Sequence, residues 1–533
     1  MTTSSSASAP PVSRSTRPPT RAADDRSAIA RLLLLFGLLV GCSSPAAHPD
    51  VDGGLAPDGS VDAAVGDANV DAAVGVTLEV TVPENTPEGD FVTVDFGSGY
   101  TRQMTRTGPR NWQLWVDDSD VGNGTVCYRY TRNDSGYLGS DYLTPDTSND
   151  YFTGCLRSFD YSPDLVVTDT VTRWRWFPPD GTDPTPVPYT SIPTVVARDS
   201  GQPLQIGVAL QDLYFSFLDD LFAPTAARLA GYGFGVVDIE PAWHALSVDP
   251  LPVIGPDYGN SPDYTEAGLR AQIQANRAQG IAVMVSPQVD PMVDFSGTHT
   301  TAWWDAWFDH YGSFLVAQAQ IAEDEGAADL SFRPDGLAAD NPPADADARW
   351  RALLSRVRAV FSGRIGLRFY GFSDGGTPGA FPDVAGVTFA DAVDFAVIVA
   401  VGPLSTDPDA DDDALLAGAA GIVDLAQPLG LPAVIEGVYS AVAQSWRGTE
   451  FYSISLANAP WNGENQWQAG TYSFDEVAQA RAHHALLRAI ASRSWVEGYL
   501  AWGYWNQDMP RGPGPSVRSK VAERLLSFWI DQM

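Results

Sequence analysis

The sequence contains few cysteine, histidine and basic residues, and it has no apolar run long enough to cross a membrane. Its 533 residues include three Cys and six His, and none of them has the spacing of a zinc site. Lys and Arg total 32 against 66 Asp and Glu, which gives a formal net charge of −34. This acidity argues against nucleic acids and anionic membrane surfaces as partners.

Three catalytic or nucleotide-binding motifs are also missing. The glycine patterns of a P-loop and of a dinucleotide-binding fold do not occur, and no serine lies in a nucleophile-elbow motif. No cofactor is expected on this basis. The chain does have the length of two or three domains, together with 16 Trp, 19 Tyr and 23 Phe. An acidic surface rich in aromatic residues suits neutral polysaccharides, although acidity alone also serves solubility.

The first 41 residues predict an export signal. A polar, Arg-containing segment precedes an apolar run over Leu32–Val40, which has the length of a signal-peptide core. The following Leu39-Val-Gly-Cys42 resembles the bacterial lipobox, which implies that Cys42 is lipidated and becomes the mature N-terminus. We therefore expect an exported lipoprotein, held at the outer membrane or cell surface through its lipid only. Residues 42–75 are rich in Ala, Gly, Pro and Asp and predict a disordered acidic tether.

Residues 76–182 predict an all-β sandwich. Short segments with strand-like composition are separated by turn-forming residues, at Val76–Val82, Phe91–Phe96, Trp112–Trp115 and Thr125–Thr131. Three sequence segments resemble those of family-20 starch-binding modules and come in the same order: Val82–Asp90, Cys127–Arg132 and Asp169–Trp174. The resemblance implies a module like those that bind carbohydrate.

The roles of several sandwich residues stay open. Four tryptophans are candidates either for stacking on sugars or for packing in the sandwich core: Trp112, Trp115, Trp174 and Trp176. Cys127 and Cys155 are the two thiols that remain in the exported chain, so we expect a disulfide between them. Residues 183–194 predict a linker to the next domain.

Residues 195–533 predict a (β/α)₈ TIM barrel, because apolar runs alternate with helical segments. The eight expected strands are Leu204–Val208, Phe234–Ile239, Ile281–Ser286, Ala328–Phe332, Ile365–Tyr370, Phe395–Val401, Pro432–Glu436 and Gly498–Trp502. A doubly wound sheet is the rival fold, but its usual glycine-rich first turn is missing. The carboxyl ends of barrel strands form the active-site face, so Glu436 would be presented to a substrate. The alternative is a glutamate that merely begins a solvated loop.

The barrel segment resembles clan A glycoside hydrolases, most of all the family-113 β-mannanases. The matching stretches run in order as Ser261–Tyr264, Ile281–Gln288, Trp303–Glu323, Trp350–Tyr370, Val393–Ser405, Leu431–Ser440 and Trp495–Asn506. The resemblance implies a retaining hydrolase that acts on a β-linked polysaccharide or oligosaccharide, with β-mannan favoured and Glu436 as nucleophile. Such an enzyme needs a second carboxyl group, protonated near neutral pH, about 5–5.5 Å from the first.

The sequence departs from the family pattern at the second carboxyl group. Asp335 or Gly336 stands where the family has its acid/base glutamate, after the fourth strand. Asp335 is therefore the acid/base candidate, and the alternative is a loop aspartate that caps the next helix. Four other strand-end carboxylates can substitute for it: Glu240, Asp290, Asp340 and Asp374. Other departures are Gln288, Gly371–Asp374 and Val401 or Gly402, where the family has His, Asn and Tyr.

Aromatic residues near strand ends are the candidates for substrate binding. Trp502 and Trp505 lie at and just past the last strand, and their rings can stack on the C–H faces of sugars. Trp243, Tyr370 and Tyr439 are further candidates. A second hypothesis is a catalytically degenerate barrel that only binds carbohydrate, because the expected strand-four glutamate is missing.

Overall fold

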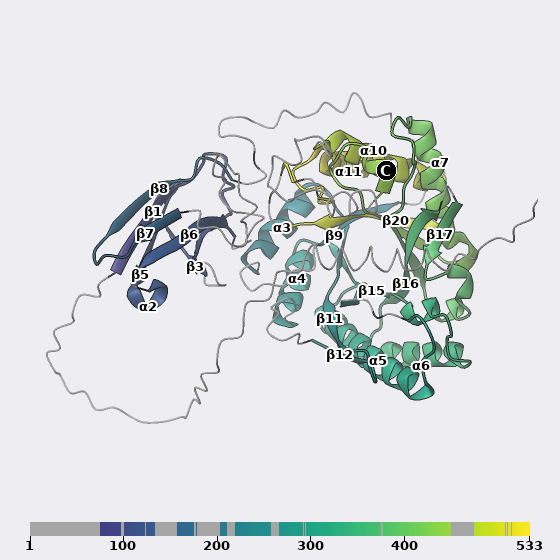
Figure 1. Cartoon of the computed structure of the whole chain (residues 1–533). Helices are drawn as coiled ribbons and strands as arrows, with labels where there is room; N and C mark the ends of the chain where they lie inside the picture. Colours follow the sequence, from purple (N-terminus) through teal and green to yellow (C-terminus); the bar gives the residue numbers. More distant parts are fainter. Residues whose placement is uncertain are drawn as a thin grey trace, which may run out of the picture.

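The computed structural model describes residues 75–96, 101–122, 124–133, 157–174, 177, 203–210, 219–256, 266–290, 293, 295–374, 377–448, 474–506, 508, 510–512 and 514–532 (Figure 1). The export signal with Cys42, most of the tether, Cys155 and the 183–194 linker lie outside these residues, so the lipoprotein and disulfide assignments stay predictions. Within the described ranges, no helix combines the length and hydrophobicity that a membrane span requires.

The N-terminal domain is a β-sandwich of two four-stranded sheets, as predicted. One sheet has the order β4 (Thr105–Arg106), β5 (Asn111–Asp117), β1 (Gly75–Thr81), β8 (Val166–Thr170). The other has the order β3 (Thr101–Gln103), β2 (Val92–Asp95), β6 (Thr125–Arg132), β7 (Arg157–Asp160). Apolar side chains from both sheets form one core, and the short helix α2 (Asp118–Val121) follows β5.

Three of the four candidate tryptophans of the sandwich fall within the described residues. Trp112 and Trp174 are buried and belong to the core between the sheets. Trp115 is 45 % exposed, because it points to the outer face of the sheet formed by β1 and β5. Trp176 lies outside the described residues. Core packing therefore accounts for Trp112 and Trp174, and Trp115 is the one left on the surface.

The C-terminal domain is a closed barrel of eight parallel strands, which confirms the predicted fold. The strands are β9 (Gln205–Leu210), β10 (Val236–Ile239), β13 (Ala282–Val285), β15 (Asp329–Phe332), β16 (Arg364–Asp374), β18 (Phe395–Ala400), β19 (Ala433–Gly437) and β20 (Val496–Tyr504). Each pairs with its neighbour along the chain, and the pairing of β20 with β9 closes the ring. Every predicted apolar run overlaps one of these strands.

Helices surround the barrel (Figure 1): α3 (Asp219–Gly231), α4 (Glu266–Ala278), α5 (Thr301–Glu325), α6 (Ala346–Arg358), α7 (Asp412–Val423), α10 (Glu476–Ala491) and α11 (Val521–Gln532). The sequence sets the ends of α5 in a recognisable way. The Thr300 hydroxyl accepts a hydrogen bond from the backbone N–H of Trp303, and Gly326 ends the helix in the left-handed conformation that glycine favours.

Short elements extend the sheet beyond the barrel. β11 (Ala242–Ser247), β12 (Val253–Gly255) and β14 (Gln288–Asp290) form a three-stranded sheet after β10 and β13. β17 (Thr377–Phe381) pairs antiparallel with the end of β16, and the 3₁₀-helix η4 (Asp335–Ala338) follows β15.

The barrel strands are buried on both faces, and alternate residues face different cores. Ile239, Ile398 and Ile435 belong to the large core between strands and helices, whereas neighbours such as Val399 and Val434 belong to a smaller cluster that also contains Leu500. The smaller cluster fills the barrel interior. Glu436 follows Ile435 and therefore points inward.

Candidate active site

Glu436 lies in the barrel interior at the end of β19, as the sequence predicts for a catalytic residue. Its register partners are Val399 of β18 and Leu500 of β20, both of which are buried. The Glu436 side chain has 0 % exposure. The alternative of a solvated loop glutamate does not fit this position.

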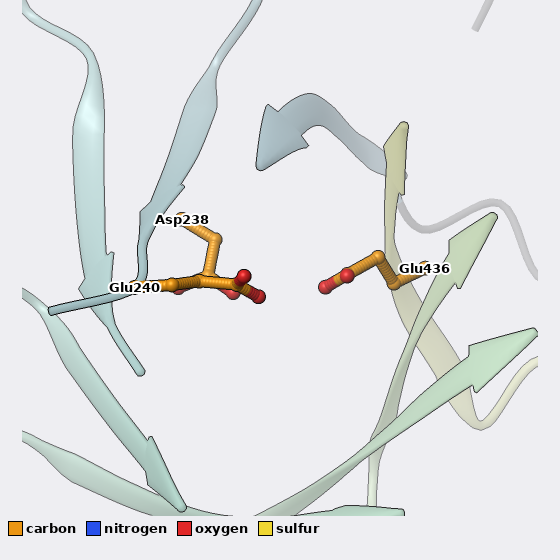
Figure 2. A group of neighbouring side chains, drawn as sticks. All are labelled: Asp238, Glu240 and Glu436. Carbon is orange, nitrogen blue, oxygen red and sulfur yellow. The ribbon is translucent and has the colours of Figure 1, made fainter. Parts of the chain in front are cut away.

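Two more carboxyl groups face Glu436 from the opposite side of the barrel (Figure 2). Asp238 lies within β10 and Glu240 directly follows that strand, so both point inward with the period of two of a β-strand. One oxygen from each of the three carboxyl groups lies within 4.8 Å of the other two. The strand-end carboxylate that meets Glu436 is therefore Glu240, which the sequence offers only as a substitute for Asp335.

The guanidinium of Arg368 binds all three carboxyl groups. Its Nη1 donates to Asp238 at 2.6 Å, and its Nη2 donates to both oxygens of Glu436 at 2.6 and 2.7 Å and to Oε1 of Glu240. We call these four residues the Arg368 cluster. The separation of the carboxyl oxygens also suits a bound metal, but the arginine already supplies a cation to this group.

The Arg368 cluster contains three acidic side chains and one basic side chain, and all four are buried. No member is more than 2 % exposed. Burial raises the pKa values of Asp238 and Glu436, and the positive charge of Arg368 opposes that rise. Burial likewise raises the pKa of Glu240, to about 6, although the positive charge of Arg368 lowers it. The cluster is therefore able to hold a proton near neutral pH.

Asp335, the acid/base candidate from the sequence, occupies a different environment. Its carboxylate pairs with Arg333 at 3.0 Å, and burial raises its pKa. The next residue, Gly336, lies against the rings of Trp304 and Trp350, which belong to the surrounding helices. Within the part of the chain that the structure describes, no hydrogen bond or ion pair joins Asp335 to Glu436. Its catalytic role stays a prediction.

Two of the aromatic candidates lie close to the Arg368 cluster. Trp502 of β20 is partly exposed, and its indole N–H donates to Oε2 of Glu240 at 2.9 Å. Tyr370 of β16 packs in the interior cluster with Trp502, and the guanidinium of Arg333 lies 5.8 Å from its ring centre. Among the described aromatic candidates, these two rings lie beside the Arg368 cluster, and their role in substrate binding stays a prediction.

The other aromatic candidates pack against, or hydrogen-bond to, other parts of the barrel domain. Tyr439 is buried, and its hydroxyl donates to the carbonyl of Gly402 at 3.0 Å. Trp243 packs on Phe314 of α5 with the ring centres 5.0 Å apart. Trp505 is partly exposed, and its backbone N–H donates to the Ser516 hydroxyl at 3.2 Å.

A pocket lies at the other end of the barrel, where the strands begin. Its lining includes Gln205, Asp329 and Arg364, the first residues of β9, β15 and β16. Arg364 is 42 % exposed there and pairs with Asp329 and Glu497. This pocket is remote from the strand ends that carry Glu436 and Glu240.

Sequence reasoning missed Arg368 and Asp238 as site residues. Each is a charged residue inside a run that otherwise reads as a buried strand, Ile365–Tyr370 and Phe234–Ile239. Charged side chains are almost never fully buried unless they are paired. One Arg and one Asp within such runs were therefore a signal that the two strands share an internal ion pair.

Residues 255–513 match the model of Glycoside Hydrolase Family 113. The barrel domain is related to the glycoside hydrolases. The matched segment contains Glu436, Arg368 and Asp335, whereas Asp238 and Glu240 precede it. No curated protein matches the chain.

Several solved structures are similar to the glycoside-hydrolase-like barrel. A GH113 β-1,4-mannanase is 17 % identical with a TM-score of 0.45, and the match covers 62 % of this chain and 99 % of that one. The GH113 β-mannanase AaManA from Alicyclobacillus acidocaldarius is 16 % identical with a TM-score of 0.46, covering 62 % and 97 %. A family 1 β-glucosidase from Thermotoga maritima is 11 % identical with a TM-score of 0.36, covering 62 % and 97 %.

Proposed function

We propose that this protein is a retaining glycoside hydrolase that cleaves a β-linked polysaccharide, with β-mannan favoured. The observation that carries the proposal is Glu436, presented at a strand end of the barrel with a second carboxyl group within 4.8 Å. The two groups are thus close enough to act on one anomeric centre, as the paired carboxyl groups of retaining enzymes do at about 5–5.5 Å. The match to Glycoside Hydrolase Family 113 and the sequence resemblance to family-113 β-mannanases support the substrate class.

Glu436 is the proposed nucleophile. Attack on the anomeric carbon requires the ionised carboxylate, and Arg368 donates hydrogen bonds to both of its oxygens. The second carboxyl group protonates the glycosidic oxygen as the bond breaks, and it later takes a proton from the water that releases the sugar. Asp335 is the candidate for this role from the sequence, and Glu240 is the candidate from the geometry.

The export signal extends the proposal to the location of the enzyme. A lipid on Cys42 would hold the chain at the outer membrane or cell surface, with residues 42–75 as a tether. The sandwich would bind the same polysaccharide and raise its local concentration at the barrel. The support for this part comes from the sequence alone.

The test measures hydrolysis of a panel of polysaccharides by the purified chain. We expect release of reducing ends from mannan or glucomannan, against xylan, β-glucan and starch as alternatives. Glu436→Gln should abolish release, and Glu266→Gln, the same change at an exposed glutamate, should not alter it. NMR of the first product formed should show the β-anomer, and an α-anomer would refute the retaining mechanism.

A non-catalytic carbohydrate-binding protein is the second candidate. The observation in its favour is the complete burial of Glu436, with both of its oxygens already bound to Arg368. Binding of a polysaccharide without turnover, unchanged in Glu436→Gln, would establish this function in place of hydrolysis.

A further inference from the structure

Glu240 lies at the carboxyl end of a barrel strand, outside the residues matched by the family model and outside the stretches that resemble family-113 β-mannanases. It follows β10, and the match to the family begins only at residue 255. Its carboxyl group nevertheless accepts from the same Arg368 nitrogen, Nη2, as Glu436 does, whereas Asp238 accepts from Nη1. The hydrogen bonds within the Arg368 cluster indicate which carboxyl group is ionised and which is protonated.

The charge balance of the Arg368 cluster requires a proton. Three ionised carboxyl groups and one guanidinium would leave two uncompensated negative charges among groups that are at most 2 % exposed. Burying an uncompensated charge costs several kcal/mol, so at least one carboxyl group is neutral. Among the described residues, the positive charge of Arg333 also acts on Glu240, and Arg333 is itself paired with Asp335.

The hydrogen bonds distinguish Glu436 from Glu240 as the ionised member. Arg368 reaches both oxygens of Glu436 but only one oxygen of Glu240. A carboxyl group that accepts charge-assisted hydrogen bonds on both oxygens from one guanidinium is favoured in its ionised form. The proton of the pair therefore belongs on Glu240.

Glu240 lies just past the carboxyl end of β10, whereas Asp238 lies within the strand. Asp238 precedes it by two residues and is completely buried within β10. Glu240 instead has its second oxygen bonded to the indole of Trp502, which is partly exposed. Of the two carboxyl groups beside Glu436, Glu240 is thus the one that contacts a partly exposed side chain.

We propose that Glu240, not Asp335, is the proton donor that works opposite Glu436, and that Trp502 positions its carboxyl group. This assignment rests on the proposed hydrolase function. In the first step Glu240 transfers its proton to the glycosidic oxygen, the C–O bond breaks, and Glu436 bonds to the anomeric carbon. In the second step the Glu240 carboxylate takes a proton from water, whose oxygen replaces Glu436 on that carbon.

The test compares two substrates in the full chain: a mannan oligosaccharide, whose leaving group needs a proton, and a dinitrophenyl β-mannoside, whose leaving group does not. Glu240→Gln should reduce turnover of the oligosaccharide by about 10²–10⁴-fold, the usual contribution of a general acid. The first step with the dinitrophenyl substrate, measured as its initial burst, should lose far less. Asp335→Asn should change both substrates by the same factor, and Glu266→Gln serves as the unaltered control.

The pH profile gives a second measurement that does not depend on a Glu240 variant folding. In the wild type, kcat/KM should fall on the alkaline side as Glu240 loses its proton. The Trp502 hydrogen bond favours the ionised form of Glu240, so Trp502→Phe should move this fall to higher pH. A purely structural role of Trp502 would lower the rate without moving the profile.

Three results would overturn the assignment. A leaving-group-dependent loss in Asp335→Asn but not in Glu240→Gln would make Asp335 the acid. Equal losses on both substrates in a folded Glu240→Gln would make Glu240 structural. A wild type without activity on either substrate would refute the proposed hydrolase function and this assignment with it.

Discussion

Replacing Arg368 with methionine should destabilise the barrel strongly at alkaline pH and weakly at acid pH. The side chain is 1 % exposed and is the cation for three buried carboxyl groups. Removing one partner of a buried ion pair costs about 3–5 kcal/mol, because the remaining charge has no compensation. We expect a loss of unfolding free energy of that size at pH 8.

The dependence on pH follows from the carboxyl groups that remain. Burial raises their folded-state pKa values, and Arg368 opposes the rise, so its removal lets them rise further. A carboxyl group with a raised folded-state pKa contributes stability below its unfolded pKa and loses it as the pH rises through the folded value. In Arg368→Met the unfolding free energy should therefore fall as the pH rises above the ordinary carboxyl range of about 4 and through the raised folded-state values, and the loss at pH 5 should be small.

Urea unfolding followed by tryptophan fluorescence at pH 5 and pH 8 measures both effects. Arg364→Met is the matched control, since it removes an arginine from the same strand, where the ion pairs with Asp329 and Glu497 are partly exposed. The control should lose about 1 kcal/mol or less at either pH. Equal losses for the two variants, or a larger loss for Arg368→Met at pH 5 than at pH 8, would refute the reasoning.

Two further predictions concern other parts of the chain. Lys520 is buried, and burial lowers its pKa to about 7. Near neutral pH the lysine is fully protonated in the unfolded chain but only partly in the folded chain, which favours unfolding. Lys520→Met should therefore raise the unfolding free energy. This gain should be larger at pH 7 than at pH 10 in urea unfolding, and a gain that grows with pH would contradict it. Cys42→Ala should move the expressed protein from the membrane fraction to the soluble fraction, as immunoblotting of the two fractions would show; retention in the membrane would contradict the predicted lipid anchor.

Most of the barrel could be predicted because its strands are buried on both faces. Such strands read as continuous apolar runs, and the run at Phe395–Val401 became β18 with almost the same bounds. The hairpin of β16 with β17 was not predicted, since Thr377–Phe381 contains Pro and Gly and has no strand-like pattern. The short sheet of β11, β12 and β14 was missed; β12 and β14 have three residues each, which is too few to show a period.

The candidate site was only half predictable, and distance along the chain is the reason. Glu436 could be singled out because a strand end fixes its position within one element. Its partners depend on how strands far apart in sequence meet, since Arg368 lies 130 residues from Asp238, 128 from Glu240 and 68 from Glu436. Local patterns carry no information on such pairings. Arg368 and Asp238 were visible only as charges that had no evident reason to lie in buried strands.

The position of the first two barrel strands in the sequence determines which truncated fragments of this domain can fold. A fragment that begins at residue 255, where the family match begins, would lack β9 and β10. It would leave β13 and β20 as open sheet edges, which tend to pair with other chains and aggregate. It would also leave Arg368 with one carboxyl partner instead of three. Inactivity of such a fragment would therefore say nothing about the intact chain.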